Sequence, residues 1–285
     1  MQSYLGKISA LITLACLVAL VGCSGGGGDS QPSDIANINS CELLGVSQKY
    51  SSYNKNVSKI VNGTPCSDSN SPVVLVIISY GNENFGGCSG TLLTNTKVLT
   101  ASHCFLGGYI RAAVANGIDG NAVAVSNVTL HPDAKERNDG SVDHDIAILT
   151  LSTPLDLPTL PIVTGAPVES GDLIGIYGYG QPDGSDNDYD IILRGGKMNV
   201  SNFEDDTFIA IYNGSNSNTC FGDSGGPALL SKKRSDGVFV KGVVGVTSTG
   251  TSDSCTVGDQ SGFTNLQDQS NLNFIRNNVS GLREE

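Results

Sequence analysis

The sequence predicts an all-β fold of two sheets or barrels, closed by one helix near the C-terminus. Glycine accounts for 36 of the 285 residues, where an average chain of this length would have about 20. Charged residues make up only 15%, against about 25% in an average domain. From residue 60 onward, short apolar runs alternate with Gly, Asn, Asp and Pro, which is typical of strands joined by turns. The length suits one large domain or two small ones.

Eight apolar runs have the length and composition of strands. They are Val73–Ile78, Lys97–Thr100, Ile110–Val114, Ala122–Leu130, Ile146–Leu151, Leu173–Tyr177, Phe208–Tyr212 and Val238–Val246. The segment Asn271–Val279 is predicted to be helical, because its apolar residues recur at helix-like spacing. The segment Pro154–Pro161 contains three prolines and is the expected connection between the two halves of the fold.

Residues 1–22 resemble a bacterial lipoprotein signal peptide. Lys7 precedes the apolar run Ile8–Val21, which is too short to span a bilayer but suits the core of a signal peptide. The run ends in Leu20–Cys23, which resembles a lipobox, where small residues precede a cysteine that is lipidated and becomes the mature N-terminus. We therefore expect a lipid anchor on Cys23. The alternative is an ordinary secretory signal cut nearby, which would give a secreted protein.

Residues 23–40 begin with Ser24 and a run of four glycines, and we expect them to form a flexible linker. In the Gram-negative lipoprotein pattern, a residue other than Asp after the lipidated cysteine favours export to the outer membrane. We therefore expect the protein to be exported and attached to that membrane.

The charge distribution excludes some classes of partner and site. The formal net charge is −12 and no basic cluster interrupts it, so we expect no nucleic-acid-binding surface. Four aspartates crowd the segment 183–190, and we interpret them as a solvated acidic loop, with calcium binding as the alternative. These residues are Asp183, Asp186, Asp188 and Asp190. We expect no metal or other cofactor to be required.

The cysteines indicate disulfides rather than a metal site. None of the eight forms a CxxC pair, so a zinc ribbon has no support. Setting aside Cys16 in the signal peptide and Cys23 at the anchor leaves six, which in an oxidising compartment predicts three disulfides. Fifteen pairings of six cysteines are formally possible. The remaining cysteines are Cys41, Cys66, Cys88, Cys104, Cys220 and Cys255.

The segment Cys220–Pro227 contains a serine among glycines, which indicates a nucleophile on a tight turn. Gly222 lets the chain turn so that its own backbone N–H and that of Ser224 converge on one point. Two such donors form an oxyanion hole, which binds the negative charge that develops during acyl transfer.

A serine hydroxyl needs a base, and the chain has three histidines. His103 directly follows a predicted strand and is the best candidate. His131 precedes Pro132, and we expect it to be a surface turn residue. His144 lies between two aspartates, and we expect it to be exposed. The alternative is that it makes a structural hydrogen bond.

The histidine in turn needs a carboxylate that fixes its tautomer. Asp145 leads directly into the apolar strand 146–149, where a buried carboxylate is costly unless it is hydrogen-bonded. Asp143 is the competing candidate, but no apolar strand adjoins it.

Taken in order along the chain, these motifs resemble those of the chymotrypsin/trypsin-like serine proteases. The order His, Asp, Ser distinguishes this family from the other folds that carry the same triad. The resemblance covers residues 60 to about 280. The matching segments are Ile60–Gly63 at the mature N-terminus, Thr100–Cys104, Asp145–Leu149, Cys220–Pro227, Gly245–Gly250 in the substrate-binding strand, and Gly262–Thr264.

The resemblance implies two six-stranded antiparallel Greek-key barrels with the site between them. Residues 60–160 would form the first barrel, and residues 161–285 the second barrel and the terminal helix. The implied activity is that of a serine endopeptidase hydrolysing protein or peptide substrates, with Ser224 as nucleophile, His103 as base and Asp145 orienting it. Gly222 and Ser224 would supply the oxyanion hole. A non-catalytic homologue acting as a surface binding module is the alternative, but such proteins usually lose a triad residue.

The resemblance also implies disulfides and a specificity pocket. Cys88–Cys104 would lie beside the histidine and Cys220–Cys255 beside the pocket, which leaves Cys41–Cys66 as the third pair. Asn218, six residues before the nucleophile, would form a neutral floor and favour uncharged or aromatic residues before the cut. If Asp259 enters the pocket instead, basic residues become favoured. Thr249 stands where the family commonly has Trp. The remaining pocket residues would be Ser248, Thr249, Gly250 and Ser261.

Finally, the resemblance implies a zymogen. Cleavage between Lys59 and Ile60 would remove residues 41–59 as a propeptide and free an Ile ammonium that pairs with Asp223. The Cys41–Cys66 disulfide would keep the propeptide, and with it the lipid anchor, attached to the active enzyme. With a neutral pocket, a separate trypsin-like protease would have to make the cut.

Overall fold

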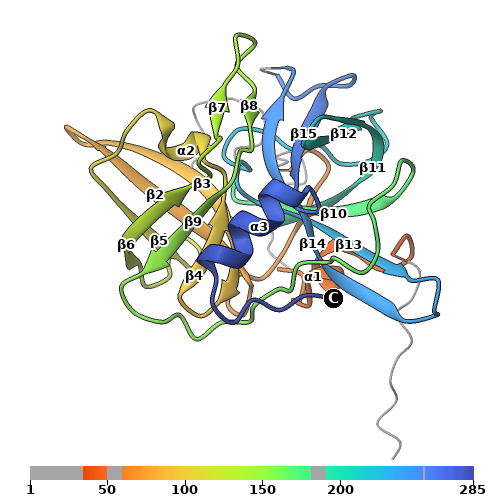
Figure 1. Ribbon diagram of the computed structural model, residues 1–285, viewed down its shortest axis with the longest axis horizontal. Helices are drawn as coiled ribbons and strands as arrows, with labels where there is room; N and C mark the ends of the chain where they lie inside the picture. The colour runs from red at the N-terminus through yellow and green to blue at the C-terminus, as the bar shows by residue number, and fades with distance from the viewer. Residues whose placement is uncertain (1–34, 50–59, 181–190, 253) are drawn as a thin grey trace, which may run out of the picture. The chain divides into compact units, whose positions relative to one another are not determined.

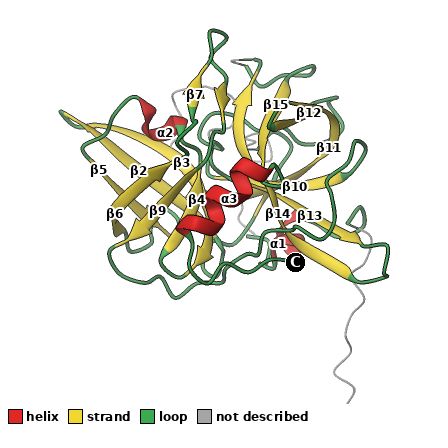
Figure 2. Cartoon of the chain, in the orientation of Figure 1, coloured by secondary structure: helices red, strands yellow, loops and turns green. Residues whose placement is uncertain are grey.

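The structure is a computed structural model that describes residues 35–49, 60–180, 191–252 and 254–285. It contains two six-stranded antiparallel β-barrels, and helices are few and short (Figures 1 and 2). The first barrel closes in the order β2-β3-β4-β9-β6-β5. Its strands are β2 (Val73–Gly81), β3 (Asn84–Thr94), β4 (Lys97–Thr100), β5 (Arg111–Ala115), β6 (Val123–Leu130) and β9 (Ala147–Leu151).

The second barrel follows the order β11-β10-β13-β14-β15-β12 and closes by pairing β12 with β11, while β1 adds to the edge of β11. Its strands are β1 (Thr64–Pro65), β10 (Leu173–Gly178), β11 (Arg194–Glu204), β12 (Thr207–Ile211), β13 (Pro227–Lys233), β14 (Phe239–Gly250) and β15 (Gln260–Asn265). A small separate hairpin consists of β7 (Lys135–Glu136) and β8 (Val142–Asp143), and the helices are α1 (Ser40–Leu44), α2 (His103–Leu106) and α3 (Gln269–Asn278). The predicted fold class is confirmed.

Each of the eight predicted strands corresponds to a strand of the structure, but β3, β11, β13 and β15 were not predicted. Glycines weaken the apolar pattern of β3 and β11, yet the packing requires them. A Cβ added at Gly90 in β3 would lie 2.7 Å from a methyl group of Val98, and one at Gly195 in β11 would lie 2.7 Å from the Tyr177 ring. At these glycine positions the two strands therefore leave space for the side chains of their neighbours.

Helix α3 follows the second barrel in sequence but packs into the core of the first (Figure 1). Its buried residues include Leu272, Phe274 and Ile275. The ring of Phe274 lies 4.9 Å from that of His131, and His131 is only 3% exposed. The prediction that His131 is a surface turn residue is therefore wrong, because α3 covers the turn.

His144 stacks on the ring of His131 at 4.6 Å between centroids. Its side chain is 24% exposed, and its Nδ1 lies 2.9 Å from the side-chain oxygen of Asn271 in α3. The structural hydrogen bond that the sequence left open is thus present, and the expected exposure is only partial.

The segment 35–49 packs on the second barrel. The Ser40 hydroxyl donates to the Gly195 carbonyl at 2.8 Å, and the Tyr177 hydroxyl donates to the Ser40 carbonyl at 2.7 Å. The Lys197 ammonium donates to the Ile35 carbonyl at 2.6 Å. Residues 35–40, which we expected to belong to the linker, are therefore part of the folded body. Within the described residues, no helix is long and apolar enough to cross a membrane.

Candidate active site

Asp145 lies just before β9 and is completely buried, with four donors around its carboxylate. Its Oδ2 lies 2.6 Å from His103 Nδ1 and accepts from the Ser248 hydroxyl at 2.6 Å. Its Oδ1 accepts from the Ser102 hydroxyl at 2.7 Å and from the backbone N–H of His103 at 2.8 Å. These bonds compensate the burial of the charge and fix the imidazole at the start of α2. Asp143, the competing candidate, instead pairs with Arg137.

The same contacts shift the pKa values of both groups. Burial alone would lower the pKa of His103, but the hydrogen bond to Asp145 and the charge of that residue raise it above its ordinary value. Burial would raise the pKa of Asp145, but the hydrogen bond and charge of His103, with the hydroxyls of Ser248 and Ser102, lower it below its ordinary value. The pair therefore favours an imidazole held by an ionised carboxylate.

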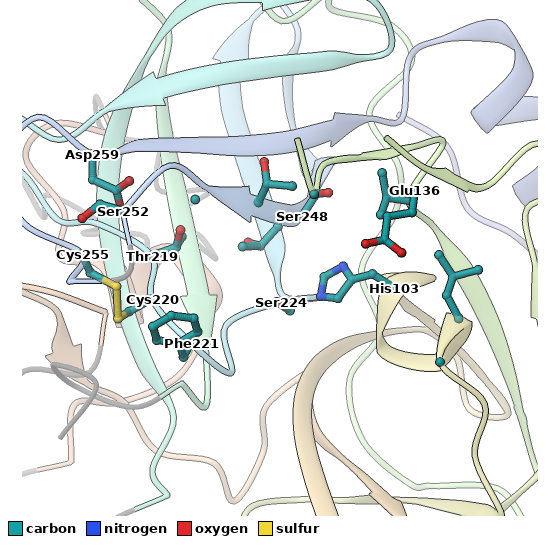
Figure 3. Close-up of a pocket in the computed structure, with 17 residues that line it drawn as sticks. His103, Glu136, Thr219, Cys220, Phe221, Ser224, Ser248, Ser252, Cys255 and Asp259 are labelled. Atoms are coloured by element: carbon teal, nitrogen blue, oxygen red, sulfur yellow. A yellow bond between two sulfur atoms is a disulfide. The ribbon is translucent and has the colours of Figure 1, made fainter. Parts of the chain in front are cut away.

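Ser224 sits on the tight turn that precedes β13, beside the imidazole of His103 (Figure 3). The turn is fixed from both sides, because Ser89 donates its backbone N–H to the Ser224 carbonyl at 2.7 Å and its hydroxyl to the Gly222 carbonyl at 2.9 Å. A Cβ at Gly225 would lie 2.1 Å from the Thr100 hydroxyl, and one at Gly226 would lie 2.1 Å from the Tyr177 carbonyl. Only glycine fits at these two positions.

Gly222 has a φ of +88°, which glycine adopts without strain. Among the residues that the structure describes, no other group of the chain accepts a hydrogen bond from the backbone N–H of Gly222 or of Ser224. These are the two donors that the sequence analysis assigned to the oxyanion hole, and they are free to bind an external oxygen.

The site opens into a cleft of about 420 Å³. One end is lined by Asp259 and the other by His103 and Glu136 (Figure 3), and Thr249 and Gly250 also line the cleft. The remaining lining residues include Thr219, Cys220, Phe221, Ser224, Ser248 and Ser252.

Asp259 lines this cleft, whereas the predicted floor residue Asn218 does not. Asn218 is fully buried behind it, where its amide donates to Asp259 Oδ2 at 2.8 Å and its carbonyl oxygen accepts from the Ser261 hydroxyl at 2.8 Å. Asp259 Oδ1 accepts from the N–H and the hydroxyl of Thr251. Asn218 and Ser261 therefore support the wall of the cleft instead of lining it, whereas Asp259, the residue of the alternative prediction, does line it.

Ser102, Ser248 and Glu136 have contacts or positions in the site that the sequence analysis did not predict. Ser102 and Ser248 both donate to Asp145, although Ser248 was expected only to line the pocket. For Ser102 the one available signal was its position directly before His103, since its side chain makes no cap hydrogen bond in α2. Nothing in the sequence pointed to Glu136, because its hairpin comes close to the cleft only in the folded chain.

All three predicted disulfides are present: Cys41–Cys66, Cys88–Cys104 and Cys220–Cys255. Cys88–Cys104 lies beside His103, and the side chains of these three residues form the one possible metal-binding group among the described residues. Because both sulfurs are in a disulfide, they offer no thiolate to a metal ion.

Part of the predicted activation site is described. Ile60 is fully buried with φ +41°, and the next residue, Val61, exchanges two backbone hydrogen bonds with Asn218. Residues 60–66 therefore pack with the second barrel, although we predicted them in the first. Asp223 is fully buried and accepts the N–H groups of Gly180 and Cys220, each at 2.9 Å.

Other predictions fall outside the described residues. These concern Lys59, the lipidation site Cys23, and the acidic residues Asp183, Asp186, Asp188 and Asp190.

Comparisons with known proteins agree with this geometry. The model of the Trypsin family matches residues 60–272. A trypsin of Saccharopolyspora erythraea is 28% identical over 218 residues, which cover 67% of this chain and 86% of the relative. A trypsin of Xenopus laevis is 27% identical over 210 residues, which cover 66% and 81%.

Solved structures of low identity share the fold. HL collagenase superposes with a TM-score of 0.62 at 20% identity, over 77% of this chain and 99% of that one. Neuropsin, a serine protease of mouse brain, superposes with a TM-score of 0.61 at 18% identity, over 77% and 100%. The chain belongs to the trypsin family. It is a trypsin/chymotrypsin-like serine endopeptidase, and its substrates are proteins or peptides.

Proposed function

We propose that Ser224, His103 and Asp145 form the catalytic triad of this endopeptidase. The observation that carries the proposal is the buried Asp145 carboxylate, which lies 2.6 Å from Nδ1 of His103, while His103 and Ser224 line the same cleft. Binding of Nδ1 leaves Nε2 as the nitrogen that accepts a proton. The raised pKa of His103 strengthens it as a base.

The reaction proceeds by two acyl transfers. Ser224 Oγ attacks the peptide carbonyl while its proton passes to His103, and the backbone N–H groups of Gly222 and Ser224 bind the oxyanion. His103 then gives the proton to the leaving amine, the C–N bond breaks, and an acyl-enzyme remains. Water then attacks the ester while its proton passes to His103; the bond to Ser224 Oγ breaks, His103 returns the proton to Oγ, and the acid leaves.

A fluorophosphonate probe tests this assignment, because it labels only an activated serine. We expect labelling of the protein, and its loss in Ser224→Ala together with a fall in kcat on the order of a millionfold. The circular dichroism spectrum should stay unchanged. A Ser224→Ala variant that kept a tenth of the activity would refute the nucleophile, and an unlabelled activated protein would favour the non-catalytic binding module.

We infer that the primary pocket takes Arg or Lys. Asp259 is 3% exposed and lines the cleft, and its donors within the described residues are all neutral. A buried carboxylate is stabilised by a cation, and a substrate guanidinium or ammonium is such a group. Such an enzyme, once active, would cut after Lys59 of further copies of this chain.

We also propose that the protein is a zymogen cut at Lys59–Ile60 and anchored through a lipid on Cys23 to the bacterial outer membrane. In the uncut chain, the φ of +41° at the β-branched Ile60 is strained, at a cost of about 1–3 kcal/mol. Cleavage removes the preceding carbonyl and with it this strain. The freed ammonium would pair with the buried carboxylate of Asp223. The contacts of segment 35–49 and the Cys41–Cys66 disulfide would retain the cleaved propeptide.

Membrane fractions of expressing cells test activation and anchoring together. We expect activity to rise on cleavage at Ile60 and to stay with the membrane. Lys59→Gln should block the rise, and Cys23→Ser should move the protein to the soluble fraction. Full activity of Lys59→Gln would refute the zymogen, and membrane retention of Cys23→Ser would refute the lipid anchor.

A further inference from the structure

The β7–β8 hairpin brings an acidic side chain to the end of the cleft opposite Asp259. In this hairpin, Glu136 pairs with Val142 and Lys135 pairs with Asp143. Because successive side chains of a strand point to opposite faces, each pair shares one face. Glu136 and Val142 line the cleft, whereas Lys135 and Asp143 line a separate surface.

The hairpin is held in place from both sides. The Arg137 guanidinium pairs with Asp143 within the hairpin and with Asp205, at 2.9 Å, in the turn between β11 and β12. Asp139 accepts the N–H and the hydroxyl of Ser141. The bond between Arg137 and Asp205 links the hairpin to the second barrel, and the other bonds stabilise the hairpin itself.

The charge of Glu136 is not compensated by its neighbours. Arg137 is engaged by two carboxylates, and the Lys135 side chain lies on the other face. Across residues 35–49, 60–180, 191–252 and 254–285, no ion pair or hydrogen bond involves the Glu136 carboxylate. In Figure 3, this carboxylate points toward the His103 end of the cleft. It therefore presents negative charge to a bound peptide.

We propose that Glu136 selects a basic residue at the position immediately before the primary residue, so that the preferred substrates are proteins with two consecutive basic residues. The proposal rests on the proposed function, with the scissile carbonyl at Ser224 and the primary side chain at Asp259. The preceding residue then lies over His103, between Leu106 and the hairpin. The stem of Arg or Lys packs on Leu106 and Val142 while its charge reaches Glu136.

The experiment compares peptide substrates with Arg before the cut and with Arg, Ala or Glu at the preceding position. Because the pair is partly exposed, we expect kcat/KM for Arg-Arg to exceed that for Ala-Arg about threefold, and the preference to shrink in high salt. In Glu136→Gln the ratio should fall to about one. In Glu136→Lys it should invert, so that Glu-Arg is cut faster than Arg-Arg.

Glu42→Gln is the matched control, because Glu42 is exposed on α1 and does not line the cleft. It carries the same change of charge and should keep the preference for Arg-Arg. Inversion in Glu136→Lys separates a charge contact from a merely structural role. An equal rate for Arg-Arg and Ala-Arg in the wild type, or a basic preference only after the cut, would overturn the proposal. Failure of the proposed function would look different, since none of the Arg peptides would be cut.

Discussion

Two buried aspartates, Asp145 beside His103 and Asp259 in the wall of the cleft, differ in the kind of partner that the chain supplies. Asp145 is fully buried and binds His103, which becomes a cation when it takes a proton. Asp259 is 3% exposed and binds only the neutral amide of Asn218 and the N–H and hydroxyl of Thr251. A buried carboxylate without a cation is costly, so Asp259 is suited to receive one from the substrate.

This difference suits Asp145 to the chemical step and Asp259 to the recognition of the substrate. In the proposed mechanism, Asp145 would orient the base in the turnover of every substrate, whereas Asp259 would meet only the side chain before the cut. Changes at position 145 should therefore reduce the rate for all substrates alike. Changes at position 259 should alter the choice among them.

Asp145→Asn is expected to have the larger effect, a fall in kcat of about ten-thousandfold for Arg and Phe substrates alike. The amide holds the wrong imidazole tautomer and cannot stabilise the imidazolium. The pH profile sharpens the test, because the catalytic base must be neutral to accept a proton. In the wild type, kcat/KM should fall as the pH drops through the pKa of His103, which the hydrogen bond and charge of Asp145 raise against the effect of burial. In Asp145→Asn the midpoint should move down, since the group that raises this pKa is lost.

Asp143→Asn is the control for this prediction, because Asp143 was the competing candidate and pairs with Arg137 near the surface. It should lower kcat less than about fivefold, as expected for an exposed ion pair. A loss in Asp143→Asn as large as that in Asp145→Asn would show that the carboxylate had been misassigned.

The sequence was sufficient to locate Asp145 because its signal is local. The residue opens a run of apolar residues that form β9, and the motifs around His103 and Ser224 are equally continuous in sequence. The strands with regular apolar runs were predictable for the same reason. The glycine-rich β3 and β11 were missed because their glycines make room for side chains of other strands, such as Val98 and Tyr177, and the sequence of β3 or β11 alone does not show those neighbours.

Asp259 could not be located in this way. It lies in the polar connection between β14 and β15, two strands whose pairing shifts register between Thr247 and Thr249 of β14. The Cys220–Cys255 disulfide and the bond from Asn218 fix the connection in space. Counting six residues back from Ser224 correctly found a residue near the pocket, but only the register of β15 decides which side chain faces the cleft. His131 was misplaced for a related reason, because α3 returns to cover it from far along the chain.

Asp259→Asn is expected to have the smaller, selective effect. The amide has nearly the shape of the carboxylate but no charge, so kcat/KM for Arg peptides should fall about a hundredfold, in the range for the loss of one partner of a buried charge pair. Rates for Phe and Ala peptides should change far less. The fluorophosphonate probe should still label Ser224, because the triad is intact.

Asp119→Asn is the matched control, since Asp119 is exposed and does not line the cleft; it should leave the Arg preference intact. Two results would break the comparison between the aspartates. A wild type that cuts Phe peptides faster than Arg peptides would mean that the neutral donors alone satisfy Asp259 and that the pocket behaves as uncharged. An Arg preference that survives Asp259→Asn would mean that another group binds the cation. A selective loss would instead assign the two carboxylates to separate tasks, because only a charge that meets the substrate side chain changes selectivity without changing the chemistry.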